Sequence, residues 1–288
     1  MGAALETLSG YLTAATTTAG TYQALTVQNT QSFTIRATPS DQAGNMLAVF
    51  GSFGAAGYGQ IKSARMHDQT IGTTFALSAN TAFPNVNQVS PYDYDEPLWN
   101  TDVLTWQITT VASQTASTAY LLGAQMYYPN LGGIAQNMMT WAQVQSYINP
   151  AQKTGLHYVS WVRPSSSGTA GAIGTGVAIN ATNDQFKANH SYALLGYLCP
   201  TSVGCVLVQG TDTGNLYVGG QGSSDPVQTR SYFVDQSIAQ NLPLVPVIQA
   251  NNKGGTLISV ADPATTSTAF TIGLIWLDLG TGVPPVGS

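Results

Sequence analysis

The sequence is poor in charged residues. Asp, Glu, Lys and Arg together make up 7% of it, whereas about 25% is usual for a soluble domain. The 8 basic residues are outnumbered by 13 acidic ones, which gives a formal net charge of −5. Binding to a nucleic-acid backbone needs a broad basic face, because the protein must replace the counterions of the phosphates. We therefore expect no direct contact with nucleic acid.

Long apolar runs and an export signal are also missing. The longest apolar stretch, Ile272 to Leu277, is far shorter than the roughly 18 residues of a membrane-spanning helix. The first residues, Met1 to Glu6, lack the basic region and the continuous apolar region of a secretory leader. We therefore expect no export through the secretory pathway, and contact with any membrane only from the side.

Cysteine is limited to two residues, Cys199 and Cys205. No second Cys or His pair lies at ligand spacing, which argues against a zinc site. The two cysteines flank a turn sequence that contains Pro and Gly between two apolar runs, so they are candidates for a disulfide across a hairpin. Two separate buried thiols are the alternative. A disulfide would indicate an exposed or thermophilic setting rather than ordinary cytosol.

The first half of the chain has the pattern of an all-β protein. Short runs rich in β-branched and aromatic residues alternate with Gly, Pro, Asn or Asp, which is typical of strands and turns. The expected strands are Tyr22–Gln28, Ser32–Thr38, Met46–Phe53, Ile61–Met66, Asp102–Ala112 and Thr118–Tyr128. Before them, residues 3–15 are predicted to form a short helix inside an N-terminal arm of residues 1–20. Residues 83–99, with three prolines, are expected to form a long loop.

The second half is predicted to contain eight strands and one helix. A linking helix within residues 135–155 precedes it, indicated by apolar residues at helical spacing up to Ile148. The expected strands are Leu156–Val162, Ala172–Ile179, Tyr192–Leu198, Cys205–Gln209, Asn215–Val218, Leu244–Gln249, Leu257–Val260 and Ala269–Leu279. A helix from Thr229 to Asn241 is expected before the last three of them.

These elements predict two sandwiches in one chain. Eight short antiparallel strands favour a jelly roll, so the predicted fold class is all-β, with two jelly-roll-like β-sandwich or barrel units and a few short helices. Residues 21–134 form the first unit, and residues 156–288 form the second with a C-terminal tail. The segments Thr118–Gly123 and Thr268–Gly273 match at three of six positions, which indicates either a duplication or chance in a chain rich in Thr and Gly.

Residues that carry chemistry are few. His67, His157 and His190 lie in separate contexts, and the sequence has no Gly-x-Ser-x-Gly motif. We therefore predict no catalytic residue, no enzymatic activity and no cofactor.

One acidic cluster offers metal ligands. Asp93, Asp95 and Glu96 are candidate metal ligands or a candidate carboxylate pair of a hydrolase, although their spacing is not that of an EF-hand. A solvated acidic loop is the other interpretation. The 5 tryptophans and 14 tyrosines fit either a sugar-binding platform or a β core and subunit interfaces, where aromatic residues are enriched.

The order of elements carries a resemblance. A weakly charged all-β chain with a helix near residues 229–241 resembles the jelly-roll major capsid proteins of tailless icosahedral viruses with an internal membrane. It looks similar to those of phages of thermophilic bacteria. This lineage commonly places a helix between its sixth and seventh strands. The resemblance covers residues 156–279 best and 21–128 more loosely, because the first half shows no counterpart of this helix. It implies upright barrels, trimers or pseudo-hexameric capsomers, and an arm that reaches neighbours or the membrane.

We therefore expect a structural major capsid protein that self-assembles into an icosahedral shell. It would be made in the host cytoplasm and reside in the virion, with copies of itself and other capsid proteins as partners. Neutral polar groups suit such contacts, since they lose less on desolvation than charges do. The alternative is a carbohydrate-binding or receptor-binding fibre or adhesin protein.

Overall fold

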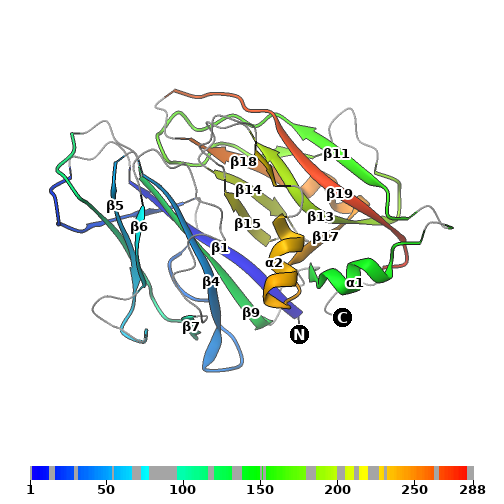
Figure 1. Cartoon of the computed structure of the whole chain (residues 1–288), viewed down its shortest axis with the longest axis horizontal. Helices are drawn as coiled ribbons and strands as arrows, with labels where there is room; N and C mark the ends of the chain where they lie inside the picture. The colour runs from blue at the N-terminus through cyan, green and yellow to red at the C-terminus, as the bar shows by residue number, and fades with distance from the viewer. Residues whose placement is uncertain are drawn as a thin grey trace.

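A computed structural model describes residues 2–12, 17–28, 32–53, 55–66, 73–77, 96–115, 120–131, 138–149, 151, 154–179, 186–199, 205–210, 214–219, 227–229, 232–262 and 266–283. These residues form four β-sheets in which all paired strands are antiparallel, with a few short helices beside them (Figure 1). The predicted all-β fold class is confirmed. No helix in this part of the chain has the length and hydropathy needed to cross a membrane.

The first unit is built from strands β1 to β9. Their bounds are β1 Gly2–Leu12, β2 Gln23–Ala24, β3 Thr26–Val27, β4 Gln42–Phe53, β5 Gly57–Lys62, β6 Thr73–Leu77, β7 Glu96–Trp99, β8 Thr105–Thr110 and β9 Tyr120–Leu131. One sheet has the order β3, β1, β9, β4, β7, and the other has the order β2, β8, β5, β6. Apart from the two-residue strand β3, strands one, eight, three and six share one sheet, and strands two, seven, four and five share the other. This is the jelly-roll order.

The second unit repeats this order. Its strands are β11 His157–Val162, β12 Val177–Ala178, β13 His190–Cys199, β14 Cys205–Gly210, β15 Gly214–Gly219, β17 Val245–Gln249, β18 Leu257–Ala261 and β19 Ile272–Thr281. The first sheet runs β11, β19, β13, β17 and the second runs β12, β18, β14, β15. The short strands β10 Met138–Met139 and β16 Val227–Thr229 add to the first sheet. The chain therefore contains two jelly-roll units, including a full set of eight strands in the first half.

Among the described residues, three short helical elements accompany the second unit. Helix α1 covers Trp141–Ser146 and begins at a capping box, in which the Thr140 hydroxyl accepts from the Gln143 N–H and the Gln143 side chain accepts from the Thr140 N–H. It is shorter than the predicted linking helix. Helix α2 covers Tyr232–Gln240 and precedes the last three strands, as predicted. A 3₁₀ helix follows β17 at Ala250–Gly255.

The prediction for the N-terminus was wrong. Residues 3–15 were expected to form a helix in an arm, but residues 2–12 are strand β1, which pairs with β9 along almost its whole length. Ala4 and Leu8 lie in the core of the first unit. Pairing with β9 and burial of one side of the strand outweigh the helix preference of Ala and Leu, because strand formation depends on cross-strand neighbours. Residues 2–12 therefore do not form an arm that could contact a membrane or a neighbouring subunit.

Each unit has its own apolar core. The first contains Trp106 from β8 and alternate residues of β9, and the second contains Trp276 from β19. Both tryptophans are at most 1% exposed. The two similar segments noted in the sequence enter equivalent strands in the same register, since Leu122 and Ile272 both point into a core, and Gly123 and Gly273 follow them.

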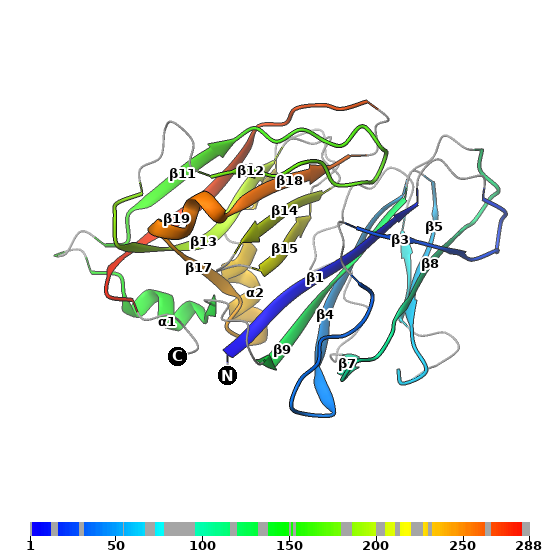
Figure 2. The same ribbon diagram turned by 180° about the vertical axis from the view of Figure 1, so that it is seen from behind.

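The two units are packed against each other. Strand β15 lies beside β1, as the two opposite views agree (Figure 2). Leu47 and Tyr127 of the first unit pack with the core of the second. The buried amide of Gln28 donates from Nε2 to the carbonyl of Gly171 at 2.5 Å and accepts from the N–H of Ile173 at 3.1 Å. The interface thus combines apolar packing with a specific hydrogen-bonded bridge.

Candidate functional site

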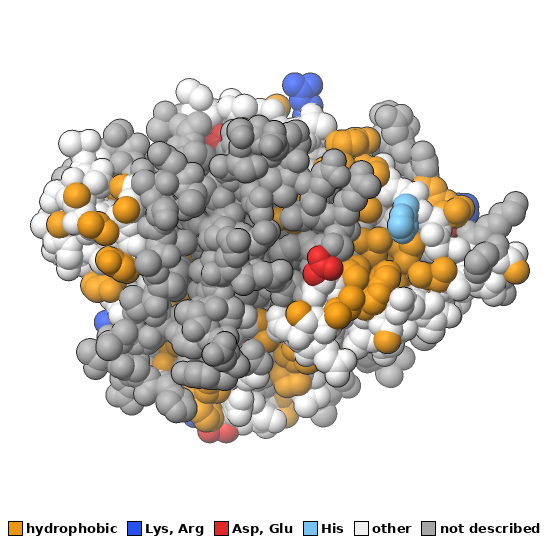
Figure 3. Space-filling view, in the orientation of Figure 1, with side chains coloured by type: hydrophobic (Ala, Val, Ile, Leu, Met, Phe, Trp, Pro, Cys, Tyr) orange, Lys and Arg blue, Asp and Glu red, His pale blue; other side chains and the backbone are white. Residues whose placement is uncertain are grey.

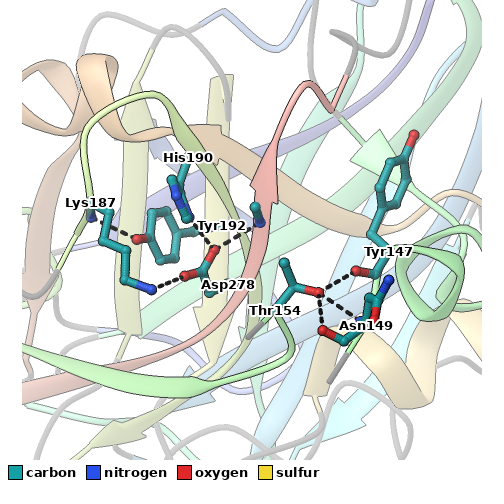
Figure 4. Close-up of polar contacts among 8 residues, drawn as sticks. Tyr147, Asn149, Thr154, Lys187, His190, Tyr192 and Asp278 are labelled. Carbon is teal, nitrogen blue, oxygen red and sulfur yellow. Dashed lines mark hydrogen bonds and ion pairs between the residues drawn. The ribbon is translucent and has the colours of Figure 1, made fainter. Parts of the chain in front are cut away.

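A buried polar cluster in the second unit surrounds Asp278. This residue lies on β19 and is fully buried. Its Oδ1 accepts from the Gly280 N–H at 2.8 Å and lies 2.7 Å from Nδ1 of His190. Its Oδ2 accepts from Nζ of Lys187 at 3.1 Å (Figure 4). A buried carboxylate needs such partners, because an unpaired charge in a core is strongly unfavourable.

The segment between β12 and β13 brings both bases to this carboxylate. Residues 187–190 form a turn in which the His190 N–H donates to the Lys187 carbonyl at 3.2 Å, and Asn189 adopts a left-handed φ of 63°. The ring of Phe186 stacks on Tyr192 with centroids 4.1 Å apart. The Lys187 N–H donates to the hydroxyl of Tyr192 at 2.7 Å. Aromatic packing therefore fixes the turn, and the turn places the two bases.

The electrostatics favour the charged form of this cluster. Burial alone would raise the pKa of Asp278, but hydrogen bonds from His190, the Gly280 N–H and Lys187 outweigh it and lower that pKa below its usual value. The hydrogen bond to Asp278 raises the pKa of Lys187. Burial raises the pKa of the Tyr192 hydroxyl to about 12. Asp278 is thus held as a carboxylate and Lys187 as an ammonium ion.

A pocket of about 600 Å³ opens beside His190 and is lined also by Ser146, Tyr147, Asn149 and Thr154. The Thr154 hydroxyl accepts from the Asn149 N–H at 2.7 Å and lies 2.8 Å from the carbonyl of Tyr147, to which it donates (Figure 4). These bonds tie the end of α1 to Thr154, and the next residue, Gly155, donates its N–H to the Asp278 carbonyl of β19 at 2.7 Å. Since Ser146 donates its hydroxyl to the Gln143 carbonyl at 2.6 Å, this serine is not hydrogen-bonded to His190.

The chemistry available at this pocket is limited. Among the described residues, no hydroxyl or thiol is hydrogen-bonded to His190, so the histidine and Asp278 have no paired nucleophile. The contacts connect the turn at residues 187–190 to β19. They are those of a structural clamp on the second unit.

A second pocket, of about 760 Å³, lies at another part of the second unit. Its polar lining includes one cation, Arg163, the amide of Gln209 and the hydroxyl groups of Ser165, Ser167 and Ser259. Neutral donors and acceptors with a single cation fit a neutral polar or weakly anionic ligand better than a polyphosphate, which needs more positive charge.

The first unit contains a comparable ion pair. Glu6 of β1 is 6% exposed. Its carboxylate accepts from Arg36 through Nε, which lies 3.1 Å from both oxygens, and through a terminal nitrogen at 2.6 Å. The hydrogen bond to Glu6 raises the pKa of Arg36. Burial, with the nearby Glu6 charge, raises the pKa of Tyr128.

The predicted metal ligands are only partly described. Asp93 and Asp95 lie outside the described residues, and of Glu96 only the backbone is described, at the start of β7. Within the described ranges, no group of three or more His, Cys, Asp or Glu residues is arranged to hold a metal ion. A cation site at the acidic cluster therefore stays a prediction.

The hairpin predicted for the cysteines was wrong. Cys199 ends β13 and Cys205 begins β14, and these strands belong to different sheets, because a jelly roll crosses between its sheets at this point. Cys199 is buried, and this burial raises the pKa of its thiol form to about 12. The side chain of Cys205 lies outside the described residues, so a disulfide stays a prediction.

The three histidines lie far apart in the sequence, and the sequence did not predict the partners of His190. His67 lies outside the described residues, His157 is exposed on β11, and His190 joins the cluster. Asp278 was not predicted as a site residue because it lies in an otherwise apolar strand. A single acidic residue within such a strand was the available signal, since burying it requires a counter-charge.

Comparisons with known proteins give little similarity. No family model and no curated protein matches the sequence. The solved structure of the PBSX exported protein XepA aligns over 93% of this chain and 86% of its own, with 8% identity and a TM-score of 0.26. A cupin 2 conserved barrel domain protein from Leptotrichia buccalis aligns over 91% of this chain and 92% of its own, with 12% identity and a TM-score of 0.17. At these TM-scores neither carries an argument about this chain.

Proposed function

We propose that this chain is a structural subunit of a viral shell, a major capsid protein that assembles with copies of itself. The observation that carries the proposal is the repetition of the jelly-roll order in two units of one chain, with α2 between the fifth and sixth strands of the second unit's sheets as they are counted by β15 and β17. The two-unit order supports the architecture implied by the resemblance to capsid proteins of internal-membrane viruses, although α2 lies one strand earlier than the helix that the resemblance implied. A fold alone does not give a function, so the surface must support it.

The surface does support it. Charged residues are 7% of the chain, and large apolar side chains are exposed at several places. Among the described residues, Val103 is 64% exposed, Ile238 60%, Trp161 44% and Tyr58 43%. Interfaces between subunits are depleted in charge and enriched in aromatic residues. A surface of this kind is stabilised when neighbouring copies cover it, since roughly 25 cal/mol is gained for each Å² of apolar area buried.

The test is the association state of the purified protein. Analytical ultracentrifugation over a wide range of concentrations should show oligomers, and negative-stain electron microscopy should show capsomers, sheets or shells. A protein that stays monomeric at every concentration and forms no particles would contradict the proposal.

The pocket around Arg163 supports a second candidate, a carbohydrate-binding or receptor-binding protein of a viral fibre. Its hydroxyl and amide lining suits the hydroxyl groups of a sugar. A glycan array would identify a ligand, and Arg163→Ala should then abolish binding while leaving association unchanged. If the protein forms particles but binds no glycan, the glycan-binding candidate is wrong and the capsid proposal stands.

A further inference from the structure

The pocket of about 760 Å³ beside Arg163, here called the Arg163 pocket, lies on the outer side of the sheet β12, β18, β14, β15. Leu257 of β18 pairs with Gln209 of β14, and Ser259 follows Leu257 by two residues, so these side chains point to the same side of the sheet. Ile258 points to the other side, into the core of the second unit. All three outward side chains line the pocket. One wall of the pocket is therefore the sheet itself.

The opposite wall is the segment 163–167, which follows β11. The Ser166 N–H donates to the Thr268 carbonyl at 2.9 Å, and the Ser166 hydroxyl accepts from the Thr268 N–H at 3.1 Å. Gly174 lets this segment approach the sheet, because a Cβ atom there would overlap the Ser165 carbonyl oxygen. Hydrogen bonds thus fix this wall before any ligand enters, and the volume is within the range of about 300–1,000 Å³ that is usual for preformed ligand pockets.

Three polar side chains that line the pocket have no partner in the described part of the chain. The side chains of Arg163, Gln209 and Ser259 make no hydrogen bond or ion pair with it. Ser259 is 2% exposed, and a polar group buried to this degree is usually hydrogen-bonded. Gly176 leaves the Ser259 hydroxyl uncovered, since a Cβ atom at this glycine would lie 3.1 Å from Ser259 Oγ. These side chains are therefore available to a polar ligand in the pocket.

Arg163 differs from the other arginines of the described residues. Arg36 is bound to the carboxylate of Glu6, and Arg65 is bound to that of Asp41. Charged side chains are sparse among the described residues on the face that Figure 3 shows, so an arginine beside a pocket without an acidic partner stands out. A guanidinium binds a carboxylate through two parallel hydrogen bonds. One guanidinium therefore matches one carboxylate, whereas a phosphate ester carries more charge.

We propose that the Arg163 pocket binds an acidic saccharide, a sugar that carries a carboxylate. Arg163 binds the carboxylate, and Gln209 and Ser259 bind ring hydroxyl groups, because both side chains donate and accept as a sugar hydroxyl does. Ile173 and Leu257, which line the same pocket, contact the C–H groups of the ring. This inference rests on the glycan-binding candidate and names the class of glycan. It does not depend on assembly.

The first experiment compares charged and neutral forms of the same sugars. The probes are the methyl glycosides of glucuronic, galacturonic and N-acetylneuraminic acid, each titrated beside its neutral methyl ester and followed by ligand-observed NMR. At least one acid should bind about 10-fold or more tightly than its ester, because hydrogen bonds to a charged group contribute more than those between neutral groups. Acetate, which has the carboxylate but no ring hydroxyl groups, should bind more weakly than that acid.

The second experiment uses variants of the pocket. Arg163→Gln should abolish the preference for the acid over its ester. Ser259→Ala should weaken the binding of both forms by about 3-fold, as expected for a neutral hydrogen bond, without lowering the melting temperature, since this hydroxyl has no partner in the described part of the chain. The matched control is Arg65→Gln, which removes an exposed arginine of the first unit and should bind like the wild type. Thermal melting checks the fold of each variant.

The outcomes separate this inference from the glycan-binding candidate. If acid and ester bind equally well, or if Arg163→Gln keeps the preference for the acid, the inference is wrong and the candidate stands. If acetate binds as tightly as the acids, the pocket recognises a carboxylate and not a saccharide, and the inference is also wrong. If no acid binds but the glycan array shows binding of a neutral glycan, only the inference fails. If no glycan binds, both fail, and the association state of the same samples tests the shell proposal separately.

Discussion

The two jelly-roll units share a strand order but differ in what covers their first sheets. In the first unit, the outer side of the sheet of β1, β9 and β4 is covered by the second unit of the same chain. In the second unit, α1 and α2 cover part of the equivalent sheet and leave Trp161 exposed. The alternation of apolar residues that builds the two cores is common to both units. Their outer surfaces are different, so we expect a difference in function between the units to depend on these surfaces.

The two units also differ in how they neutralise a buried carboxylate. Each buries a carboxylate on a strand of its first sheet, Glu6 on β1 and Asp278 on β19. Each receives a base from the segment that precedes the third strand of its jelly roll, Arg36 before β4 and Lys187 before β13. Glu6 is bound by one half-exposed guanidinium, whereas Asp278 is fully buried and has three donors. We therefore expect the stability of the second unit to depend more on its ion cluster than that of the first unit does.

The largest expected effect concerns the cores and tests whether the units fold as one. Trp106→Ala and Trp276→Ala each remove a fully buried indole and should lower the free energy of unfolding by about 3–5 kcal/mol. Because Leu47, Tyr127 and Gln28 bind the units together, we expect one cooperative thermal transition that both substitutions shift. Calorimetry measures it.

The matched controls for the cores are Trp106→Phe and Trp276→Phe, which keep an aromatic ring and should cost less. Two separate transitions, each moved by one substitution only, would show that the units are independent. That result would also support a domain boundary near residues 135–155, which the structure leaves as a prediction.

The next effect compares the two carboxylates. Asp278→Ala leaves the Gly280 N–H without its acceptor and two bases without their counter-charge, and it should cost about 3 kcal/mol. Glu6→Ala should cost about 1–2 kcal/mol, because Arg36 is 48% exposed and water can solvate it. Urea unfolding of both variants measures the difference. Equal losses of unfolding free energy in the two variants would show that the number of hydrogen-bond donors does not determine how much each carboxylate stabilises its unit.

Sequence patterns predicted the strands better than the polar contacts. The second jelly roll and α2 followed from alternating apolar residues and turn signals, because these features are local. Strand β1 was missed, since an Ala-rich and Leu-rich segment becomes a strand only through its pairing with β9. Asp278 and His190 are 88 residues apart, and the turn that joins them depends on aromatic packing. Contacts of this kind are set by the assembled fold and have no local signature.

The bridge between the units gives a smaller effect. Gln28→Ala removes the donor to the Gly171 carbonyl and the acceptor for the Ile173 N–H, and two polar groups of the interface lose their partners. We expect a loss of about 2 kcal/mol. The loss should come with weaker coupling, seen as a broader thermal transition. Gln28→Glu is the control for size, and Gln114→Ala is a control at an amide outside the bridge. A stability change below about 0.5 kcal/mol would show that the bridge contributes little.

The smallest effect is the pH dependence of the Asp278 cluster. The pKa of Asp278 is lowered in the folded state, so its contribution to stability is fully present above the unfolded value of about 3.9 and is lost as the pH falls through the folded value. Asp278→Asn mimics the protonated side chain. The difference in unfolding free energy between the wild type and Asp278→Asn should therefore shrink as the pH falls from about 5 to 2, a range in which mainly carboxyl groups change protonation. A difference that stays constant over this range would mean that the charge of Asp278 does not stabilise the second unit, and its advantage over the ion pair of the first unit would then come from shape and hydrogen bonding alone.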